Sequence, residues 1–136
     1  EFLNTLVGPK GDPGSSVGIS YNYEESLNLT TVTNSTFNNK VILTENLSTS
    51  DYKIGWCYGC GGEEKSQINV QGTVDNVILF EHIQEFRHAI NNDIRPYSIF
   101  RKVSFTQGNH TIILRFKSLD RDVYLSNAAI ELIKLT

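Results

Sequence analysis

Short segments in which every second residue is apolar recur along this chain, and they limit the fold more than any other feature of the sequence. The pattern is clear at Tyr52–Trp56, where residues 52, 54 and 56 are apolar, and at Thr111–Phe116, where residues 112, 114 and 116 are apolar. In an extended strand, successive side chains point to opposite faces, so this alternation is typical of strands with one buried face. The segments between them are rich in Asn, Gly and Ser, which favour turns. The sequence therefore predicts strands that are joined by turns.

About seven to nine short strands are expected from this pattern. They lie near residues 27–32, 40–43, 52–58, 66–84, 99–105, 111–116 and 128–135, and the long pattern at 66–84 fits one bent strand or two strands around Gly72. Turns are expected at 45–51, 59–65, 107–109 and 119–122, and His110 is expected to cap the hairpin at the third of them. Many short strands with regular turns favour two stacked sheets. The expected fold class is an all-β, antiparallel β-sandwich of the jelly-roll type over residues 19–136.

One segment, at residues 80–91, also has apolar residues at helical spacing. They are Phe80, Ile83, Phe86 and Ile90. Alternation with a period of two fits the first half of this segment equally well, and Pro96 prevents a helix from continuing past Asp93. We therefore expect a strand that is followed by an irregular loop.

The bulk composition excludes two classes of partner. The formal net charge is −3 over 136 residues, without the basic stripe that nucleic-acid binding requires, so no nucleic-acid partner is expected. No stretch of about eighteen apolar residues occurs, so no membrane insertion is expected. A basic segment followed by an apolar run, which would mark a signal peptide, is also not visible. The length fits a single domain.

The first eighteen residues differ from the rest, because residues 8–16 are three consecutive Gly-X-Y triplets. Gly8, Gly11 and Gly14 begin the triplets, and Val17 stands where a fourth glycine would be. A collagen triple helix needs glycine at every third residue because only glycine fits at its axis. These residues are therefore interpreted as a trimer stem or its vestige, although a plain Gly/Pro-rich linker would have a similar composition. A stem implies a homotrimer.

Five segments follow one another in a fixed order. The first is an apolar strand, and the next four contain the patterns Tyr-x-Ile-Gly-Trp, Glu-His-x-Gln-Glu, Gly-x-His-Thr-Ile and Asn-Ala-x-Ile-Glu. They are Lys40–Thr44, Tyr52–Trp56, Glu81–Glu85, Gln107–Ile112 and Asn127–Leu132. This series resembles a head domain found at the C-termini of phage tail-fibre and other virion proteins, and the resemblance covers about residues 37–136. It consists of core and turn positions. It implies a jelly-roll fold, a virion or extracellular-appendage location and a trimer on a fibrous stalk, and it identifies no ligand.

The motif Cys57-Tyr58-Gly59-Cys60 is the sharpest local signal. A redox-active pair needs a helix N-terminus to lower the thiolate pKa, whereas the expected context here is the end of a strand. A structural zinc site needs four ligands, and the sequence has no second cysteine pair. Histidines at 82, 88 or 110 would have to complete such a site in space. We expect two unbridged thiols or a disulfide, local or between subunits, and neither a metal nor a cofactor.

Catalysis is not expected. Glu81 and Glu85 would lie on one face of a strand, but about 13 Å apart, which is too far for the carboxylate pair of a glycoside hydrolase. We expect these carboxylates to bind arginines instead, namely Arg87, Arg95 or Arg101. The sequence also has no nucleophile elbow, phosphate-binding loop or His-Glu-x-x-His motif.

Carbohydrate binding is the remaining chemistry. Jelly rolls bind sugars on a sheet face or at loop tips, where aromatic rings stack on the sugar and polar groups bind its hydroxyls. Two loops carry such residues, one after Tyr58 and one before Tyr97. The candidate ligand-binding residues are Tyr58, Glu63, Asn92, Asp93, Arg95 and Tyr97. Alternatively, the two tyrosines pack between subunits.

The expected function is a non-catalytic head domain of a phage fibre, spike or similar extracellular appendage, which recognises a host-surface glycan as a homotrimer. The alternative is a subunit of a filament or of a capsid decoration, which would donate residues 2–7 as a strand to the sheet of a neighbour. A glycan-degrading enzyme is not expected, because no constellation of carboxylates is evident.

Overall fold

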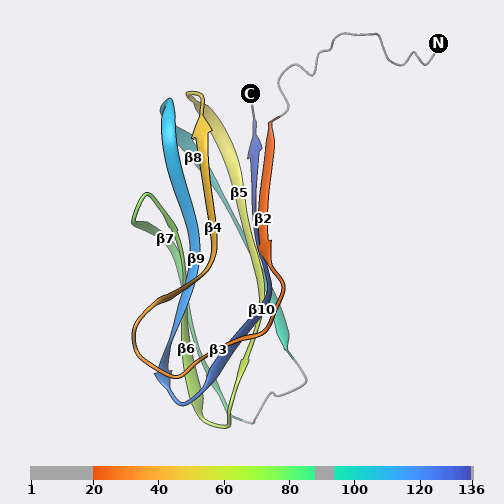
Figure 1. Cartoon of the computed structure of the whole chain (residues 1–136), viewed down its shortest axis with the longest axis vertical. Helices are drawn as coiled ribbons and strands as arrows, with labels where there is room; N and C mark the ends of the chain where they lie inside the picture. Colours follow the sequence, from red (N-terminus) through yellow and green to blue (C-terminus); the bar gives the residue numbers. More distant parts are fainter. Residues whose placement is uncertain (1–19, 88–93, 136) are drawn as a thin grey trace, which may run out of the picture.

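The computed structural model describes residues 20–87 and 94–135, and these residues form nine strands in two antiparallel sheets (Figure 1). The predicted stem, with Gly8, Gly11 and Gly14, lies outside the described residues, as do Asn92 and Asp93. The strands are β2 (Tyr21–Ser26), β3 (Thr30–Val32), β4 (Asn38–Leu47), β5 (Ser50–Gly62), β6 (Ser66–Val74), β7 (Val77–Phe86), β8 (Arg95–Phe105), β9 (Gly108–Asp120) and β10 (Val123–Lys134).

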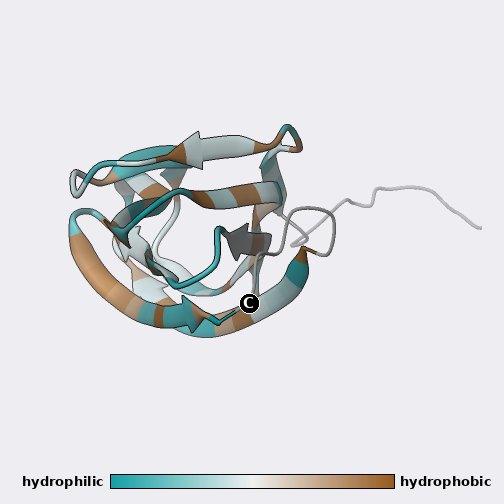
Figure 2. Cartoon of the chain, turned by 90° about the horizontal axis from the view of Figure 1, so that it is seen from below, coloured by the Kyte–Doolittle hydropathy of each residue, from teal (hydrophilic) through white to brown (hydrophobic). Residues whose placement is uncertain are grey.

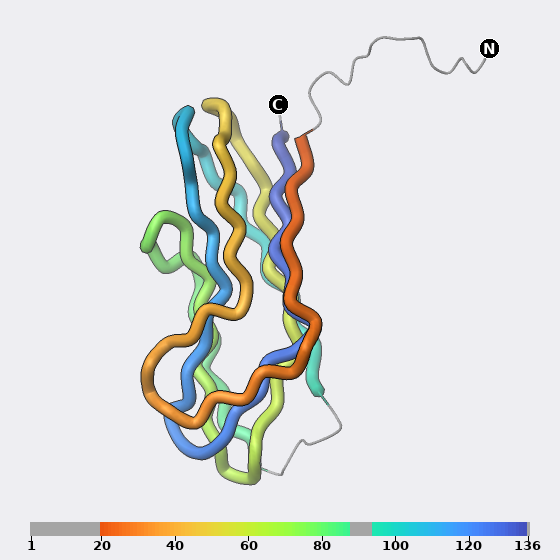
Figure 3. Tube along the Cα trace, in the orientation of Figure 1, coloured from red at the N-terminus to blue at the C-terminus, as the bar shows by residue number. Residues whose placement is uncertain are grey.

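The strand order is that of a jelly roll. One sheet has the order β2-β10-β5-β8, with β3 also paired to β10, and the other has the order β4-β9-β6-β7. The pairs are nested along the chain: β6 pairs with β7, β5 with β8, β4 with β9, and β2 with β10. The first and last described strands therefore lie side by side (Figure 3). The expected all-β, antiparallel jelly-roll fold is confirmed.

The hydrophobic core lies between the two curved sheets, which are seen along the sandwich in Figure 2. Strand β5 shows how the alternation builds it, because Ile54, Trp56 and Tyr58 point inward and are at most 2% exposed. The indole of Trp56 meets the ring of Phe80 edge-on, with centroids 5.2 Å apart. Burial of such apolar surface is the main force that holds the two sheets together.

The predicted first strand, at residues 27–32, is partly wrong. The chain instead forms β2 and β3 with a break between them, and Leu27 and Leu29 in this break are more than half exposed. The reason lies in β10, which pairs with both short strands and has a bulge at Asn127. The backbone N–H of Asn127 donates to the carbonyl of Leu27 (3.1 Å), so the break faces the bulge.

The pattern at residues 66–84 forms two strands, but the turn is not at Gly72. Asp75 and Asn76 form the turn, with φ angles of 49° and 69°, as a tight hairpin turn requires. Gly72 lies inside β6, where a side chain would overlap the Phe80 ring. The expected strand at the start of residues 80–91 is confirmed as part of β7.

The predicted loop at residues 59–65 is shorter than expected. Strand β5 continues to Gly62, because residues 59–62 pair with β10 and residues 59–60 also pair with β8. Only Glu63–Lys65 forms the turn, and Lys65 has a φ of 66°. None of the described residues forms a helix that could span a membrane.

Candidate ligand-binding groove

Tyr58 lies within β5, as its alternation with Ile54 and Trp56 predicts, and it lines a hollow although its ring is almost fully buried. It is 2% exposed, because the inward alternation of β5 continues through it. Its hydroxyl donates to Nδ1 of His82 (2.8 Å), and Nε2 of His82 donates to Oε1 of Gln84 (3.1 Å). Burial lowers the pKa of His82, which agrees with a neutral ring that accepts at one nitrogen and donates at the other.

Tyr97 belongs to the same network. Its hydroxyl donates to Oε1 of Gln84 (2.5 Å), and its ring centroid lies 5.7 Å from that of Tyr58 and 4.3 Å from that of His82. Gln84 and His82 are on β7, whereas Tyr97 is on β8, so the network joins the edges of the two sheets. Both tyrosines thus belong to one hydrogen-bonded network, and both line the same hollow between β5 and β8.

Glu63 and Arg95, the two other described members of the predicted set, are not brought into one site with these tyrosines. The carboxylate of Glu63 accepts the backbone N–H of Asp122 (3.3 Å) and so braces the turn between β9 and β10. Arg95 is exposed at the start of β8, opposite Cys60.

The two cysteines are free, which agrees with the expected alternative of unbridged thiols and not with a local disulfide. Cys57 points outward from β5 and is exposed, whereas Cys60 points into the core, because residues three apart on a strand lie on opposite faces. Burial raises the pKa of Cys60 to about 12, and burial also raises the pKa of Cys57. Both therefore stay protonated thiols near neutral pH.

Glu81 has amide partners in place of the predicted arginines. Its carboxylate accepts hydrogen bonds from Gln71 (2.6 Å) and Asn69 (3.0 Å), which lower the pKa of this group. Gln71 in turn accepts from Arg115 (2.7 Å), so these groups form a ladder across the outer face of the second sheet. His110 has its predicted structural role, since its Nε2 donates to the carbonyl of Thr106 across the hairpin turn (2.7 Å).

A hollow that the sequence did not indicate lies on the outer face of the β2-β10-β5-β8 sheet. It has a volume of about 180 Å³, and Gly55 and Cys57 of β5 form its floor together with Ala129 of β10. The ring of Phe100 leans over Gly55 from β8, so close that a Cβ atom at Gly55 would be 3.0 Å from the ring. The glycine therefore keeps this floor open.

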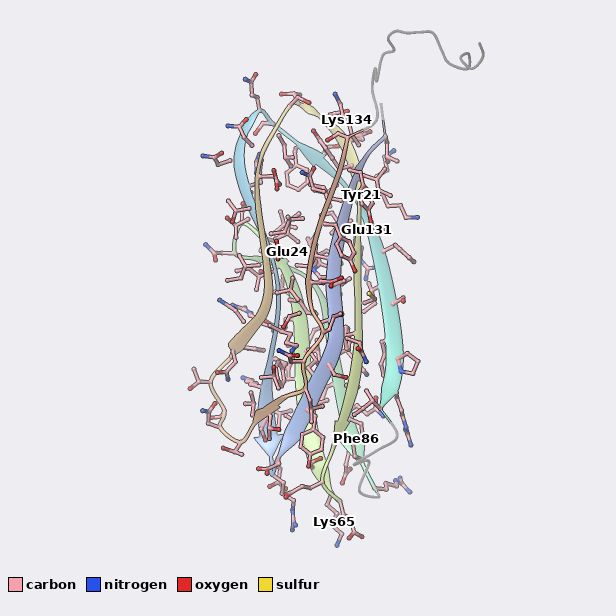
Figure 4. The ribbon with its side chains drawn as sticks, turned by 45° about the vertical axis from the view of Figure 1, so that its right-hand side comes forward. Tyr21, Glu24, Lys65, Phe86, Glu131 and Lys134 are labelled. Atoms are coloured by element: carbon pink, nitrogen blue, oxygen red, sulfur yellow. The ribbon has the colours of Figure 1, made fainter. Side chains whose placement is uncertain are left out.

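Tyr23 lines the hollow from β2, and Tyr21 stacks on it. The rings of Tyr21 and Tyr23 on β2 lie 6.3 Å apart and nearly parallel, and each is about half exposed. Tyr21 donates to Oε2 of Glu131 (3.0 Å), which fixes this carboxylate next to the floor, and Figure 4 shows the two residues side by side. The hydrogen bond with Glu25 raises the pKa of Tyr23 to about 12, so this hydroxyl stays protonated.

A second hollow of about 270 Å³ adjoins the first, because both are lined by Cys57 and Ser98. It continues along β5 to Gly59 and is bounded by Pro96 of β8 and by Asn127 at the bulge of β10. A β-bulge changes the direction of the side chains beside it, and here the bulge of β10 places Asn127 in the lining of the hollow. We call the two hollows together the outer groove.

The outer groove carries little charge. Among the described residues that line it, Glu131 has the one acidic or basic side chain. The ammonium of Lys53 lies at its end, 4.4 Å from the ring centroid of Phe100. No group of three or more His, Cys, Asp or Glu side chains within residues 20–87 and 94–135 could hold a metal ion. The aromatic side chains of the groove can stack on the apolar face of a ligand ring, and its polar side chains can bind hydroxyl groups.

The alternating pattern of β5 could have indicated the floor of this groove. If Ile54, Trp56 and Tyr58 face the core, then Gly55, Cys57 and the following glycine must face outward and leave a low floor. The residues that form the walls could not be predicted from this pattern, because they depend on which strands pair with β5.

No protein-family model matches this chain, and no curated protein matches it. Two of the solved structures that are similar in fold illustrate the likeness. Dimeric latent PorU from Porphyromonas gingivalis superposes with a TM-score of 0.59 and 7% identity, over 86% of this chain and 12% of PorU. VP2 from a subviral particle of infectious bursal disease virus superposes with a TM-score of 0.60 and 8% identity, over 94% of this chain and 37% of VP2. The chain thus spans well under two thirds of either protein, and likenesses at such low identity establish only that it has a jelly-roll β-sandwich fold.

Proposed function

We propose that this domain is a non-catalytic recognition unit of a virion or an extracellular appendage, and that the outer groove binds a glycan on a host surface. One observation carries the proposal: exposed aromatic rings stand on both sides of a floor of glycine, cysteine and alanine. Sugar rings present flat apolar faces that stack on exposed aromatic side chains. Phe100 is 51% exposed and Tyr23 is 46% exposed, so both rings are available for such contacts.

The polar groups of the groove complement the hydroxyls of a sugar. Glu131 uses Oε2 to accept the bond from Tyr21, and its Oε1 lies near Gly55, 3.5 Å from the position that a Cβ would take there. This oxygen can accept a hydrogen bond from a ligand hydroxyl. In the second hollow, Ser98 and Asn127 supply a hydroxyl and an amide. A site whose floor is a central strand needs little rearrangement on binding, which favours affinity.

Two features support the proposed location on a virion or an extracellular appendage. The fold is shared with part of VP2, and the Gly-X-Y triplets at residues 8–16 are consistent with a trimer stem. A trimer would present three grooves, and the simultaneous use of several weak sites raises the overall affinity for a surface. Trimerisation belongs to the proposal.

A glycan array probed with the whole chain tests the proposal directly. We expect binding to a restricted set of neutral glycans, and we expect Phe100→Ala to weaken the affinity for the best of them about tenfold, because one stacking ring is lost. The affinity can be measured through Trp56, the single tryptophan, which lies behind the groove floor.

Ile42→Ala is the matched control. Ile42 is exposed to a similar extent (47%) but lies on β4, in the other sheet, so this variant should bind like the unmodified chain. An array without any bound glycan would contradict the proposal, as would equal binding by the Phe100→Ala variant. Growth of fibres without glycan binding would instead support a filament subunit.

A further inference from the structure

A second concave site lies at one end of the sandwich, and the outer groove does not account for it. It has a volume of about 330 Å³ and lies between the ends of the two sheets, where described residues enter β2 and leave β10. Figure 4 shows Lys134 at this end and Lys65 at the opposite end. The lining residues, which share no member with the groove, are Ser20, Asn22, Glu45, Asn46, Leu47, Ser48, Tyr52, Gln107 and Lys134. We call this site the end pocket.

The end pocket has an apolar floor and a polar wall. Leu47 and Tyr52 are buried beneath it, and the hydroxyl of Tyr52 is already bound to the carbonyl of Ser48 (3.0 Å). The wall consists of side chains that can donate or accept hydrogen bonds. They come from β2, β4, β10 and the turn between β8 and β9, so the fold collects them from distant parts of the sequence.

The important feature is that the charged groups of the wall are unpaired. Glu45 and Lys134 are both half-buried. Within the part of the chain that the structure describes, neither side chain has a hydrogen bond or an ion pair, and the same holds for the amide of Asn22. A partly desolvated charge without a counter-charge is unfavourable, and a ligand that supplies the counter-charge relieves this. Because the two do not pair with each other, a gap separates them.

We propose that the end pocket binds a small zwitterion of the amino-acid type. Its carboxylate would meet the ammonium of Lys134, its ammonium would meet the carboxylate of Glu45, and neighbouring amides such as Asn22 would bind the remaining polar atoms. Charge-assisted hydrogen bonds of this kind are the strong ones, and two of them at fixed separation select against molecules that carry a single charge.

Free alanine is the probe, and the whole chain, labelled with ¹⁵N, is the protein. We expect alanine to shift the backbone amide signals of end-pocket residues saturably. N-Acetylalanine, which keeps only the negative charge, and alaninamide, which keeps only the positive charge, should each bind about tenfold more weakly or worse. A neutral hexose serves as a probe for polyol binding.

Two substitutions test the two proposed charge contacts separately. Lys134→Gln should abolish the preference for alanine over alaninamide, and Glu45→Gln should abolish the preference over N-acetylalanine. Lys65→Gln, at the opposite end of the sandwich, should leave binding unchanged. Tm measurements on each variant separate loss of binding from loss of folding.

Three results would overturn the inference. They are the absence of shifts with alanine, equal binding of the singly charged analogues, and shifts of the same amides by the hexose but not by alanine. None of them contradicts glycan binding at the outer groove, because the end pocket and the groove share no lining residue.

Discussion

Two glycines in this chain serve opposite purposes, and both are explained by what a side chain would meet. At Gly72, which faces the core, an added Cβ would overlap the Phe80 ring and come within 2.8 Å of the Trp56 indole. At Gly55, which faces the outer groove, an added Cβ would meet only the tip of the Phe100 ring at 3.0 Å and Glu131 at 3.5 Å. The first position allows the core to close, and the second keeps a surface hollow open.

We expect Gly72→Ala to destabilise the fold by about 1–3 kcal/mol, because the extra methyl overpacks two interlocked aromatic rings. Gly55→Ala should change stability by only about 0.5 kcal/mol, since Phe100 is exposed and can move, but it should weaken glycan binding. Urea denaturation followed by Trp56 fluorescence measures both. Equal losses of stability in the two variants would show that this distinction between core and groove is incorrect.

The cysteines give a second test at the residue scale. Cys57 is exposed and Cys60 is buried, so one thiol of the native chain should react with a thiol reagent, and both should react after denaturation. Cys57→Ser should leave the Tm in oxidising buffer unchanged, because no bond to Cys60 is lost. A lower Tm for this variant, together with a smaller assembly, would reveal a disulfide between subunits.

At the scale of elements, His110 joins two hairpin turns. Its Nδ1 lies 2.6 Å from a carboxylate oxygen of Asp75 in the β6–β7 turn, and its Nε2 lies 2.7 Å from the carbonyl of Thr106 in the β8–β9 turn. Both partners can act as acceptors, so this arrangement favours the imidazolium, in which both ring nitrogens donate. The hydrogen bond to Asp75 accordingly raises the pKa of His110.

This arrangement predicts how stability depends on pH. The folded state holds the His110 proton more tightly than the unfolded chain, in which the pKa is about 6.5. The stabilisation is thus fully present below about pH 6.5 and is lost as the pH rises through the higher pKa of the folded state. It should also fade in strong acid, where Asp75 becomes protonated; the pKa of Asp75 is lowered by its bonds to His110 and Thr111, although burial opposes this.

Thermal unfolding of the unmodified chain and of His110→Asn at a series of pH values measures the effect. The difference in Tm should shrink between pH 6 and pH 8. A difference that stays constant over this range would mean that the ring is neutral in the folded state.

At the scale of the whole molecule, the nested pairing closes a single core and leaves outer faces free for contacts with other molecules.

If residues 1–18 form a trimer stem, the whole chain should be trimeric, and a chain that begins at Ser20 should show a smaller trimer fraction at the same concentration. Native mass measurement distinguishes the cases. An undiminished trimer would assign the subunit contacts to the β-sandwich, and monomers in both would remove the stem from the proposed function.

The sequence by itself determined the fold class and most strands, because alternation records locally which side chains face the core. The alternation alone places Ile54, Trp56 and Tyr58 on one face of a strand. Only the tertiary structure decided which residues wall the two sites. Gly55, Phe100 and Glu131 come together only because β5 lies between β8 and β10. Glu45 and Lys134 line one pocket only because the jelly roll brings the ends of β4 and β10 to one end of the sandwich. Strand pairing of this kind depends on the packing of the whole chain, which no local pattern encodes. The same reason explains the end of β5: residues 59–65 indicated a loop, but pairing with β10 extends the strand to Gly62.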